Sequence, residues 1–380
     1  MKKKILIVVG TRPELLKVAK LYLDLKKVKK FKTYICISGQ HTNLMNQSLN
    51  IFNIKPDIHF KINVKNRSLS GLTNIIMEKV NIALKKIKPD ILIVHGDTVT
   101  TYSSALSGFY LKIPIAHIEA GLRTYDLLNP FPEELYRQIV SRISDYHFVP
   151  HIQNKKNLAS ERVKSKKIIV TGNTIIDTLK ILLKKINNNK KYNNSIKKKL
   201  EKIVRLNLIN KKIILITMHR RENLDNGLKS LCKALKNLSS KYLDYDFIIP
   251  VHPNPLVKNF IYRNLKNRKN INIIKSLDYD LFIFLAKQSK LILTDSGGIQ
   301  EEAPSLGTPV LVLRNKTERL KSIKHKNSIL IGNQYKDIVK NFEHLISNKK
   351  LLVSMSKIKD LYGDGMASYR IIKVLQKILI

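Results

Sequence analysis

Three short segments in the first half of the chain combine acidic residues with arginines. They are His95-Gly96-Asp97-Thr98, His117 to Arg123 and Pro132 to Arg137, and they contain four carboxylates and two arginines. Carboxylates can exchange protons with a reacting group, and arginines can hold a negatively charged leaving group. The segments fall near expected strand ends and helix starts, where α/β proteins assemble their active sites. We therefore expect an acid–base site in this half of the chain.

Acidic residues follow two neighbouring strands of the expected sheet. The run from Ile91 to Val94 is continuously apolar, as in a parallel strand buried on both faces, and Asp97 comes just after it. The next strand, Ile113 to Ile118, ends in the same way at Glu119. The two carboxylates are therefore expected to converge on one crevice.

A purely structural interpretation of the same residues is also open. Asp97 could cap the helix that begins near Thr98, and Glu119 could pair with Arg123. Because acids recur at the strand ends of adjacent units, we favour the functional interpretation.

Two further strand exits are suited to an anionic ligand. Gly10 allows a tight exit after the first strand, and Arg12 would point into the crevice near a helix N-terminus. In the second half, the backbone N–H groups of Ser296, Gly297 and Gly298 could cradle a pyrophosphate, and Glu302 could accept hydrogen bonds from ribose hydroxyls. Neither exit has the three spaced glycines of a dinucleotide fingerprint, so a nicotinamide cofactor is not expected.

Histidines follow two strands of the second half. His219 could exchange protons or donate to a phosphate near neutral pH, and Arg220 and Arg221 could neutralise phosphate charge. A capping histidine beside a surface ion pair is the alternative. For His252, in a proline-bounded strand exit, the functional and structural interpretations are about equal.

The composition limits the class of protein. With 380 residues and 43% hydrophobic content, the chain is long enough for two α/β domains. The formal charge of +42, from 70 Lys+Arg against 28 Asp+Glu, suggests a nucleic-acid or anionic-membrane partner, but the lysines are spread through most expected helices and favour a solvated surface. Cys36 and Cys232 lack metal-ligand spacing. Neither a signal peptide nor a membrane span is apparent, so we expect a cytoplasmic protein without a specific nucleic-acid or membrane partner.

Strands and helical segments alternate through both halves, which predicts two doubly wound parallel sheets. The expected strands are Ile5–Val9, Thr33–Ile37, Ile91–Val94, Ile113–Ile118, Tyr146–Val149, Ile168–Val170, Ile213–Thr217, Phe247–Val251, Ile271–Ile274, Leu291–Thr294 and Val310–Leu313. Two such domains facing across a cleft would surround one ligand.

The expected domain boundaries follow from these elements. An N-terminal Rossmann-like domain covers 1–185, and a C-terminal nucleotide-binding Rossmann-like domain covers 200–365. Between them, 186–199 is rich in Asn and Lys without clear periodicity, which predicts an exposed linker or loop. The last segment, 366–380, is expected to be an amphipathic helix that packs back on the N-terminal domain.

The order of the motifs resembles that of the non-hydrolysing UDP-N-acetylglucosamine 2-epimerases. The matching segments are Gly10–Glu14, Gly39–His41, His95–Thr98, His117–Arg123, Pro132–Arg137, Thr171–Thr174, His219–Asn223, Pro250–Pro255, Asp295–Glu302 and Thr317–Arg319. The resemblance spans nearly the whole chain. It implies a GT-B-type fold, a homodimer, and reversible epimerisation of UDP-GlcNAc and UDP-ManNAc without a cofactor or metal, supplying ManNAc-type sugars for cell-surface polysaccharide synthesis.

The resemblance also assigns roles by position. The implied catalytic residues are Asp97, Glu119, Glu133 and His219. The implied nucleotide-sugar ligands are Arg12, Lys17, Ser296, Gly297, Gly298, Glu302 and Arg319, with Phe282 beside the uracil. Gln40, His41 and Arg67 correspond to a regulatory nucleotide-sugar site.

The chain departs from the family pattern at two places. Leu320-Lys321 stands where the family has Pro-Glu, and Arg67 stands where the family has a glutamine associated with regulation. Because a guanidinium donates hydrogen bonds but accepts none, Arg67 is expected to alter the affinity for an activating nucleotide sugar.

The family's chemistry needs such residues because C2 of UDP-GlcNAc is not adjacent to a carbonyl. Elimination of UDP across C1–C2 gives 2-acetamidoglucal, and UDP then adds back while C2 receives a proton on its other face. The sequence leaves open which of Asp97, Glu119 and Glu133 serves each face. The alternatives are a retaining GT-B glycosyltransferase, a hydrolysing epimerase and, in a different class, a basic nucleic-acid-binding protein.

Overall fold

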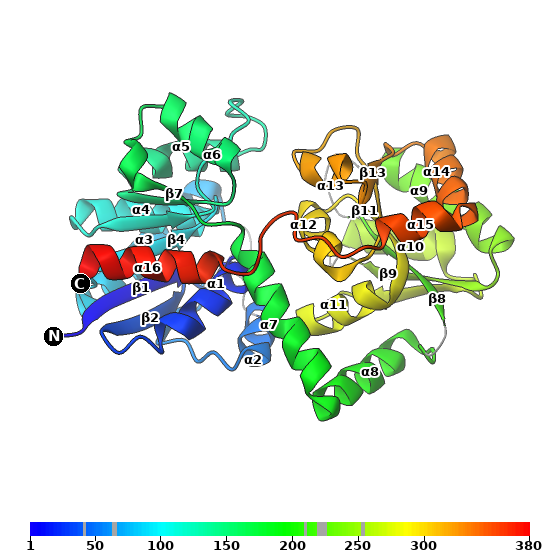
Figure 1. Cartoon of the computed structure of the whole chain (residues 1–380), viewed down its shortest axis with the longest axis horizontal. Coiled ribbons are helices and arrows are strands. Elements are labelled where there is room, and N and C mark those ends of the chain that lie inside the picture. Colours follow the sequence, from blue (N-terminus) through cyan, green and yellow to red (C-terminus); the bar gives the residue numbers. More distant parts are fainter. Residues whose placement is uncertain (41–42, 63–66, 209–210, 219–225, 252–254) are drawn as a thin grey trace. The chain divides into compact units, whose positions relative to one another are not determined.

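Two parallel sheets divide the chain into two α/β units (Figure 1). The computed structural model describes residues 1–40, 43–62, 67–208, 211–218, 226–251 and 255–380. The first unit contains Met1–Ile181 and Tyr362–Ile380, and the second contains Leu182–Leu361. The sequence instead predicts a first domain that ends at 185 and a second domain that covers 200–365.

The first sheet has seven strands in the order β3-β2-β1-β4-β5-β6-β7. Its strands are β1 (Lys3–Val9), β2 (Phe31–Ile37), β3 (Ile58–His59), β4 (Ile91–His95), β5 (Ile115–Ile118), β6 (Tyr146–Val149) and β7 (Ile168–Val170). The helices of this unit are α1 (Arg12–Leu25), α2 (Asn43–Ile51), α3 (Leu69–Ile87), α4 (Val99–Tyr110), α5 (Glu133–Ile143), α6 (Ile152–Ser160) and α16 (Ala367–Leu379), and a 3-10 turn covers Ser165–Lys167. The helix α7 (Thr174–Asn188) begins in this unit and ends in the second.

The second sheet has six strands in the order β10-β9-β8-β11-β12-β13. They are β8 (Lys212–Thr217), β9 (Tyr245–Val251), β10 (Ile271–Lys275), β11 (Ser289–Thr294), β12 (Val310–Val312) and β13 (Ser328–Leu330). The helices are α8 (Lys190–Val204), α9 (Asn226–Lys241), α10 (Pro255–Leu265), α11 (Tyr279–Gln288), α12 (Gly297–Leu306), α13 (Leu320–Lys324), α14 (Tyr335–Ser347) and α15 (Lys349–Met355).

Each sheet reverses its direction of growth at one point. The chain first builds outward from β1 through β2 to β3 and then returns to add β4 on the other side of β1. The second sheet does the same around β8, with β11 as the returning strand. The carboxyl ends of strands on either side of such a switch point are where open α/β sheets bind ligands.

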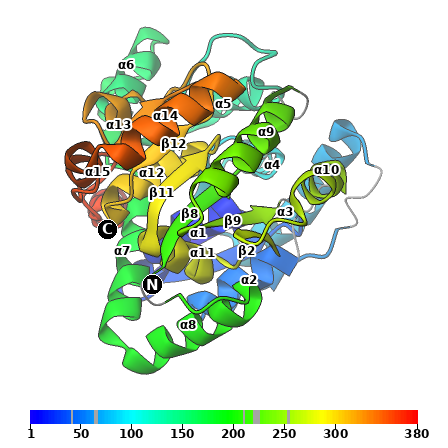
Figure 2. The same ribbon diagram turned by 90° about the vertical axis from the view of Figure 1, so that its right-hand side faces the viewer.

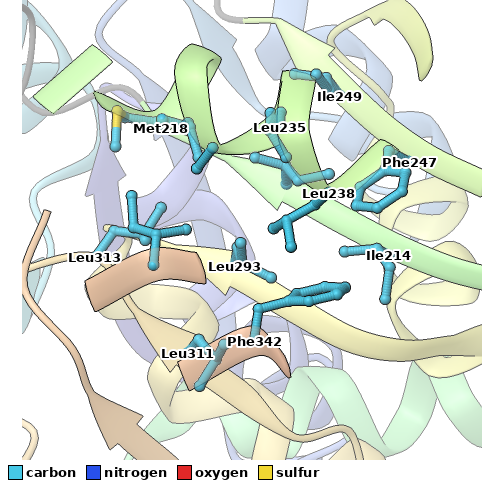
Figure 3. Packing of buried hydrophobic residues seen from close by; sticks show 14 of the residues in the cluster. Ile214, Met218, Leu235, Leu238, Phe247, Ile249, Leu293, Leu311, Leu313 and Phe342 are labelled. Carbon is cyan, nitrogen blue, oxygen red and sulfur yellow. The ribbon is translucent and has the colours of Figure 1, made fainter. Parts of the chain in front are cut away.

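Buried apolar residues pack around the strands that lead to each switch point. The residues Ile5 to Val9 of β1 are completely buried, which explains their unbroken apolar run. In the second unit, α9 and α14 pack beside the strands (Figure 2), and Phe247 stacks on Phe342 with ring centroids 6.0 Å apart (Figure 3). Such packing fixes the strand ends that carry polar residues.

The interpretation of 186–199 as an exposed linker is wrong. These residues form the end of α7 and most of α8, separated by Asn189, whose side chain accepts a hydrogen bond from Tyr192 N at 2.9 Å and caps α8. Ile196 and Leu200 are buried on one face of α8. The many lysines and asparagines of the exposed face hide this apolar spacing.

Other differences are smaller. The short strands β3 and β13 were not expected, because runs of two and three residues carry little pattern. The strand β5 begins at Ile115, after the proline at 114. The terminal helix α16 belongs to the first unit and packs against α1 (Figure 1). In the described ranges, every helix is too short or too polar to cross a membrane.

Candidate functional site

A buried carboxylate organises the switch point of the first sheet. Glu14 Oε2 accepts hydrogen bonds from Gly10 N at 3.1 Å and Thr11 N at 2.7 Å, and its Oε1 accepts one from Thr98 Oγ1 at 2.8 Å. A Cβ on Gly10 would lie 2.0 Å from Thr100 Oγ1, so only glycine fits this close approach. Burial raises the pKa of Glu14, against the lowering effect of its hydrogen bonds. Glu14 therefore joins the start of α1 to the turn that carries the first candidate acid.

That acid, Asp97, lies in the turn between β4 and α4. Thr98, not Asp97, caps α4, since its Oγ1 accepts from Thr101 N at 3.1 Å. The capping interpretation of Asp97 is therefore wrong. Its Oδ2 instead accepts from Arg137 Nε at 2.8 Å and lies 2.7 Å from the same guanidinium's NH2.

The second candidate acid, Glu119, pairs with a different cation. Its Oε2 accepts a short hydrogen bond from Lys17 Nζ and lies 3.4 Å from His95 Nε2. Burial alone would raise the pKa of Glu119, but the charge of Lys17 and the contacts with His95 outweigh it and hold that pKa well below the ordinary value. Its backbone is left-handed, with φ of 62°, an uncommon conformation that clusters at functional positions.

The interpretation in which Glu119 pairs with Arg123 is also wrong. Arg123 donates to both carboxylate oxygens of Glu161, at 2.6 and 2.8 Å, and to Ser141 Oγ at 2.8 Å. This buried fork holds α5 and α6 to the loop after β5, so Arg123 has a structural role. Lys17, expected among the nucleotide-sugar ligands, contacts Glu119.

The third candidate acid, Glu133, is the first residue of α5 and is partly exposed. Its neighbour Glu134 is completely buried and binds Arg137 NH1 through Oε2 at 3.1 Å. The family resemblance names Glu133 as catalytic and gives no individual role to Glu134 or Arg137. The signal was present in the Pro-Glu-Glu run followed three residues later by arginine, a spacing that forms ion pairs on a helix.

The structure also locates three other candidates of the first unit. Arg12 is partly buried in the first turn of α1. Gln40 Oε1 accepts from Thr100 Oγ1 at 3.1 Å, next to the Gly10 turn. Arg67 is exposed just before Ser68, the capping residue of α3. His41 lies outside the described residues.

In the second unit, the small-residue turn after β11 begins α12. Ser296 is the capping residue, and its N donates to Thr294 Oγ1 at 3.0 Å. A Cβ on Gly297 would lie 3.1 Å from Arg319 Cζ, so the guanidinium packs directly on the glycine backbone. Gly298 is exposed at the helix start. The turn and the arginine together offer backbone N–H groups and a positive charge at one place.

Acids of α12 anchor this arrangement. Glu301, which was not singled out from the sequence, accepts from Arg319 Nε at 3.0 Å and lies 2.9 Å from its NH2. Glu302, expected to bind ribose, accepts through Oε1 from Tyr279 OH at 2.7 Å. A carboxylate can accept several hydrogen bonds, which is the property that binding a ribose hydroxyl requires. Phe282 is partly buried on the neighbouring helix α11.

His219 and His252 lie outside the described residues. Within the described ranges, no group of three or more His, Cys, Asp or Glu side chains is arranged to hold a metal ion.

Comparisons with known proteins match the whole chain. The family model described as UDP-N-acetylglucosamine 2-epimerase matches residues 23–376. The UDP-N-acetylglucosamine 2-epimerase of Neisseria meningitidis serogroup A is 42% identical over 374 residues, which is 98% of this chain and 99% of the relative. That of Campylobacter jejuni is 42% identical over 377 residues, 99% of this chain and 98% of the relative.

Solved structures agree with these relatives. The crystal structure of the Neisseria meningitidis enzyme bound to UDP-GlcNAc has a TM-score of 0.91 and 42% identity, covering 98% of this chain and all of that one. A Methanocaldococcus jannaschii enzyme in complex with UDP-GlcNAc and UDP has a TM-score of 0.84 and 32% identity, covering 98% of this chain and 99% of that one. The two α/β domains with parallel sheets thus have the GT-B-like fold of these structures.

Proposed function

The chain belongs to the UDP-N-acetylglucosamine 2-epimerase family, and from this premise we propose that it inverts C2 of UDP-GlcNAc by eliminating UDP and adding it back. The enzyme is an isomerase, and its reaction is the reversible epimerisation of UDP-GlcNAc to UDP-ManNAc. Elimination accounts for how a hydrogen without an adjacent carbonyl can be removed.

In the forward direction, the C2–H bond and the bond from C1 to the UDP oxygen break, and a C1–C2 double bond forms. The proton passes to an enzyme base, and the electron pair of the C1–O bond leaves with UDP. In the second step UDP adds back to C1, and C2 receives a proton on the opposite face. Two proton-transfer groups and a cationic site for the diphosphate are therefore needed.

The pairing of Asp97 and Glu119 with separate cations, at one edge of the first sheet, is the observation that carries the proposal. The charge of Lys17 holds the pKa of Glu119 well below its ordinary value and so favours the ionised carboxylate, the form that accepts a proton. Glu133 at the start of α5 completes the proposed acid–base group. His219 is included because its motif matches the family, although it lies outside the described residues.

The second unit is proposed to hold the nucleotide. The N–H groups of Ser296, Gly297 and Gly298 would bind the diphosphate together with Arg319, which packs on the glycine backbone. Glu302 would accept from the ribose, and Phe282 would flank the uracil. The family resemblance also assigns Arg12 and Lys17 of the first unit to nucleotide-sugar binding.

The wider role is proposed on the family resemblance. We expect a cytoplasmic homodimer that supplies ManNAc-type sugars for cell-surface polysaccharides. A second molecule of UDP-GlcNAc would activate it at a site containing Gln40, His41 and Arg67. Epimerisation would require neither NAD nor a metal.

Product analysis tests the proposal against its alternatives. Purified protein incubated with UDP-GlcNAc should give UDP-ManNAc at equilibrium, with only traces of free UDP. Release of free ManNAc with stoichiometric UDP would indicate a hydrolysing epimerase. Sugar transfer to an added acceptor, without UDP-ManNAc, would indicate a glycosyltransferase.

A further inference from the structure

One guanidinium joins two carboxylates on different elements of the first unit. Arg137 Nε and NH2 both contact Asp97 Oδ2, at 2.8 and 2.7 Å, while NH1 donates to Glu134 Oε2 at 3.1 Å. The Arg137 side chain is 16% exposed and that of Glu134 is completely buried. Burial would lower the pKa of Arg137, but the attraction of Asp97 and the bonds to both acids raise it. The cation is therefore fixed between the two acids.

Glu134 is held from several sides. Besides Arg137, it accepts hydrogen bonds from Thr124 N, Tyr125 N and Gln138 Nε2, each at 3.1 Å. A buried carboxylate is stable only when paired and hydrogen-bonded in this way. Glu134 thus fixes both Arg137 and the middle of the loop that leads from β5 to Glu133.

The helix that carries Arg137 is itself anchored against the helix that follows Asp97. Tyr136 of α5 stacks on Tyr102 of α4, with ring centroids 4.9 Å apart and planes inclined by 12°. Since α4 begins directly after the Asp97 turn, this stacking also positions α5 relative to that turn. A guanidinium fork in a fixed place can then orient a carboxylate more strictly than a flexible ammonium could.

Only one oxygen of Asp97 is used by this contact. Both nitrogens of the fork bind Oδ2, and Oδ1 accepts no hydrogen bond from the residues that the structure describes. The Asp97 side chain is 26% exposed. One oxygen is thus held by the protein while the other is left for a ligand.

We propose that Arg137 and Glu134 are positioning residues of the epimerase: Glu134 fixes Arg137, and Arg137 holds Asp97 by one oxygen so that the other meets C2 of the sugar. This inference rests on the proposed catalytic role of Asp97. It predicts that loss of Arg137 lowers kcat and leaves the KM for UDP-GlcNAc nearly unchanged, because the nucleotide is held elsewhere.

A double-mutant cycle separates this role from a general structural one. Arg137→Gln should lower kcat by about 10²-fold, the typical effect of misplacing a catalytic group. Asp97→Asn should lower it at least as much. In the double variant, Arg137→Gln should add almost nothing to the loss already caused by Asp97→Asn, since residues that act as a unit are strongly non-additive. Losses that multiply, or a normal kcat in Arg137→Gln, would overturn the proposal.

A second variant of Arg137 keeps the test valid if Arg137→Gln folds poorly. Arg137→Lys keeps the charge that buried Glu134 requires but loses the fork, so it should fold, bind UDP and still lose kcat. Wild-type kcat in folded Arg137→Lys would mean that only the charge matters and would overturn the role of the fork.

Arg142→Gln is the matched control, because Arg142 lies exposed on the same helix and donates to the backbone oxygen of Glu161. Its kcat should be that of the wild type. Guanidinium ion should restore part of the kcat of Arg137→Ala in a saturable manner and should not change Arg142→Ala. Absence of any rescue, with the variant folded, would contradict a positioning role for the guanidinium. If the wild-type protein itself fails to epimerise UDP-GlcNAc, the proposed function fails and not this inference alone.

Discussion

The two units build their sheets in the same order but place different chemistry at the switch point. At the first, the acids Asp97 and Glu119 each contact a cation from another element, Arg137 or Lys17. At the second, a glycine turn is packed against Arg319, which is itself held by acids. One topology thus supports carboxylates paired with cations in one unit and an anion cradle in the other. The strand order therefore determines where a ligand binds, and the residues after each strand determine the chemistry at that position.

Replacing the acids of the first unit with amides should cause the largest loss of turnover. Asp97→Asn and Glu119→Gln should each lower turnover by about 10² to 10⁴, the usual contribution of a general acid or base. Because the second unit is assigned the nucleotide, calorimetric affinity for UDP should stay near that of the wild type. Near-normal turnover in both variants would remove these residues from the acid–base group, and a parallel loss of UDP binding would erase the distinction between the units.

In the second unit, a substitution should cause a smaller loss, and this loss should be in UDP binding rather than in turnover. Arg319→Ala should weaken UDP binding by roughly 10- to 100-fold, the equivalent of a lost hydrogen bond to a charged group, while kcat changes little. Glu301→Gln should weaken binding less, by loosening Arg319. The control is Glu318→Gln, since Glu318 also pairs with Arg319, at 2.7 Å from its NH1, but its side chain is half exposed. Equal losses in the two glutamate variants would show that burial of Glu301 is not what orients the arginine.

A third expected effect concerns stability against pH rather than activity. Burial lowers the pKa of His117 to about 3 and that of His147 to about 4, and the two residues are neighbours in register on β5 and β6. With the pKa depressed in the folded state, their contribution is complete above the unfolded pKa of about 6.5 and is lost as the pH falls from there toward 4. Urea denaturation of the wild type should therefore show stability decreasing over this range.

The variant His147→Gln isolates this contribution, because it removes one titrating group from the same buried place. It should be less stable than the wild type at pH 7 but should lose less stability between pH 7 and pH 4. An identical pH dependence in both proteins would contradict the assignment of this window to the buried histidines.

The sequence predicts the buried strands and the acids that follow them, but not the cations with which these acids pair. Runs such as Ile91 to Val94 identify the buried strands, and the polar residues just after them locate Asp97 and Glu119. Contacts between residues far apart in the chain leave no local pattern. The pairs Lys17 with Glu119 and Arg319 with Glu301 depend on how the strands are ordered. The family resemblance assigns both cations to the nucleotide sugar, but the sequence does not predict their carboxylate partners.

The segment 186–199 was misread for a different reason. Its lysines and asparagines have the composition of a linker, whereas Ile196 and Leu200 supply a buried face for α8. A mostly polar helix has few apolar positions per turn, so the composition of this segment predicts a linker although its spacing is that of a helix. The paired roles of Glu133 and Glu134 were likewise hidden, since two adjacent acids at a helix start have the same local signature whether one is buried or not.

Epimerisation in heavy water shows whether the hydrogen at C2 is exchanged with solvent during the reaction. If C2 is inverted by elimination and re-addition, with acids of the first unit exchanging their proton with solvent, UDP-ManNAc formed from UDP-GlcNAc should carry deuterium at C2. Proton NMR of the product would show the loss of the C2 signal. Product that forms with complete retention of its original C2 hydrogen would contradict the elimination route and require a carrier that returns the same hydrogen.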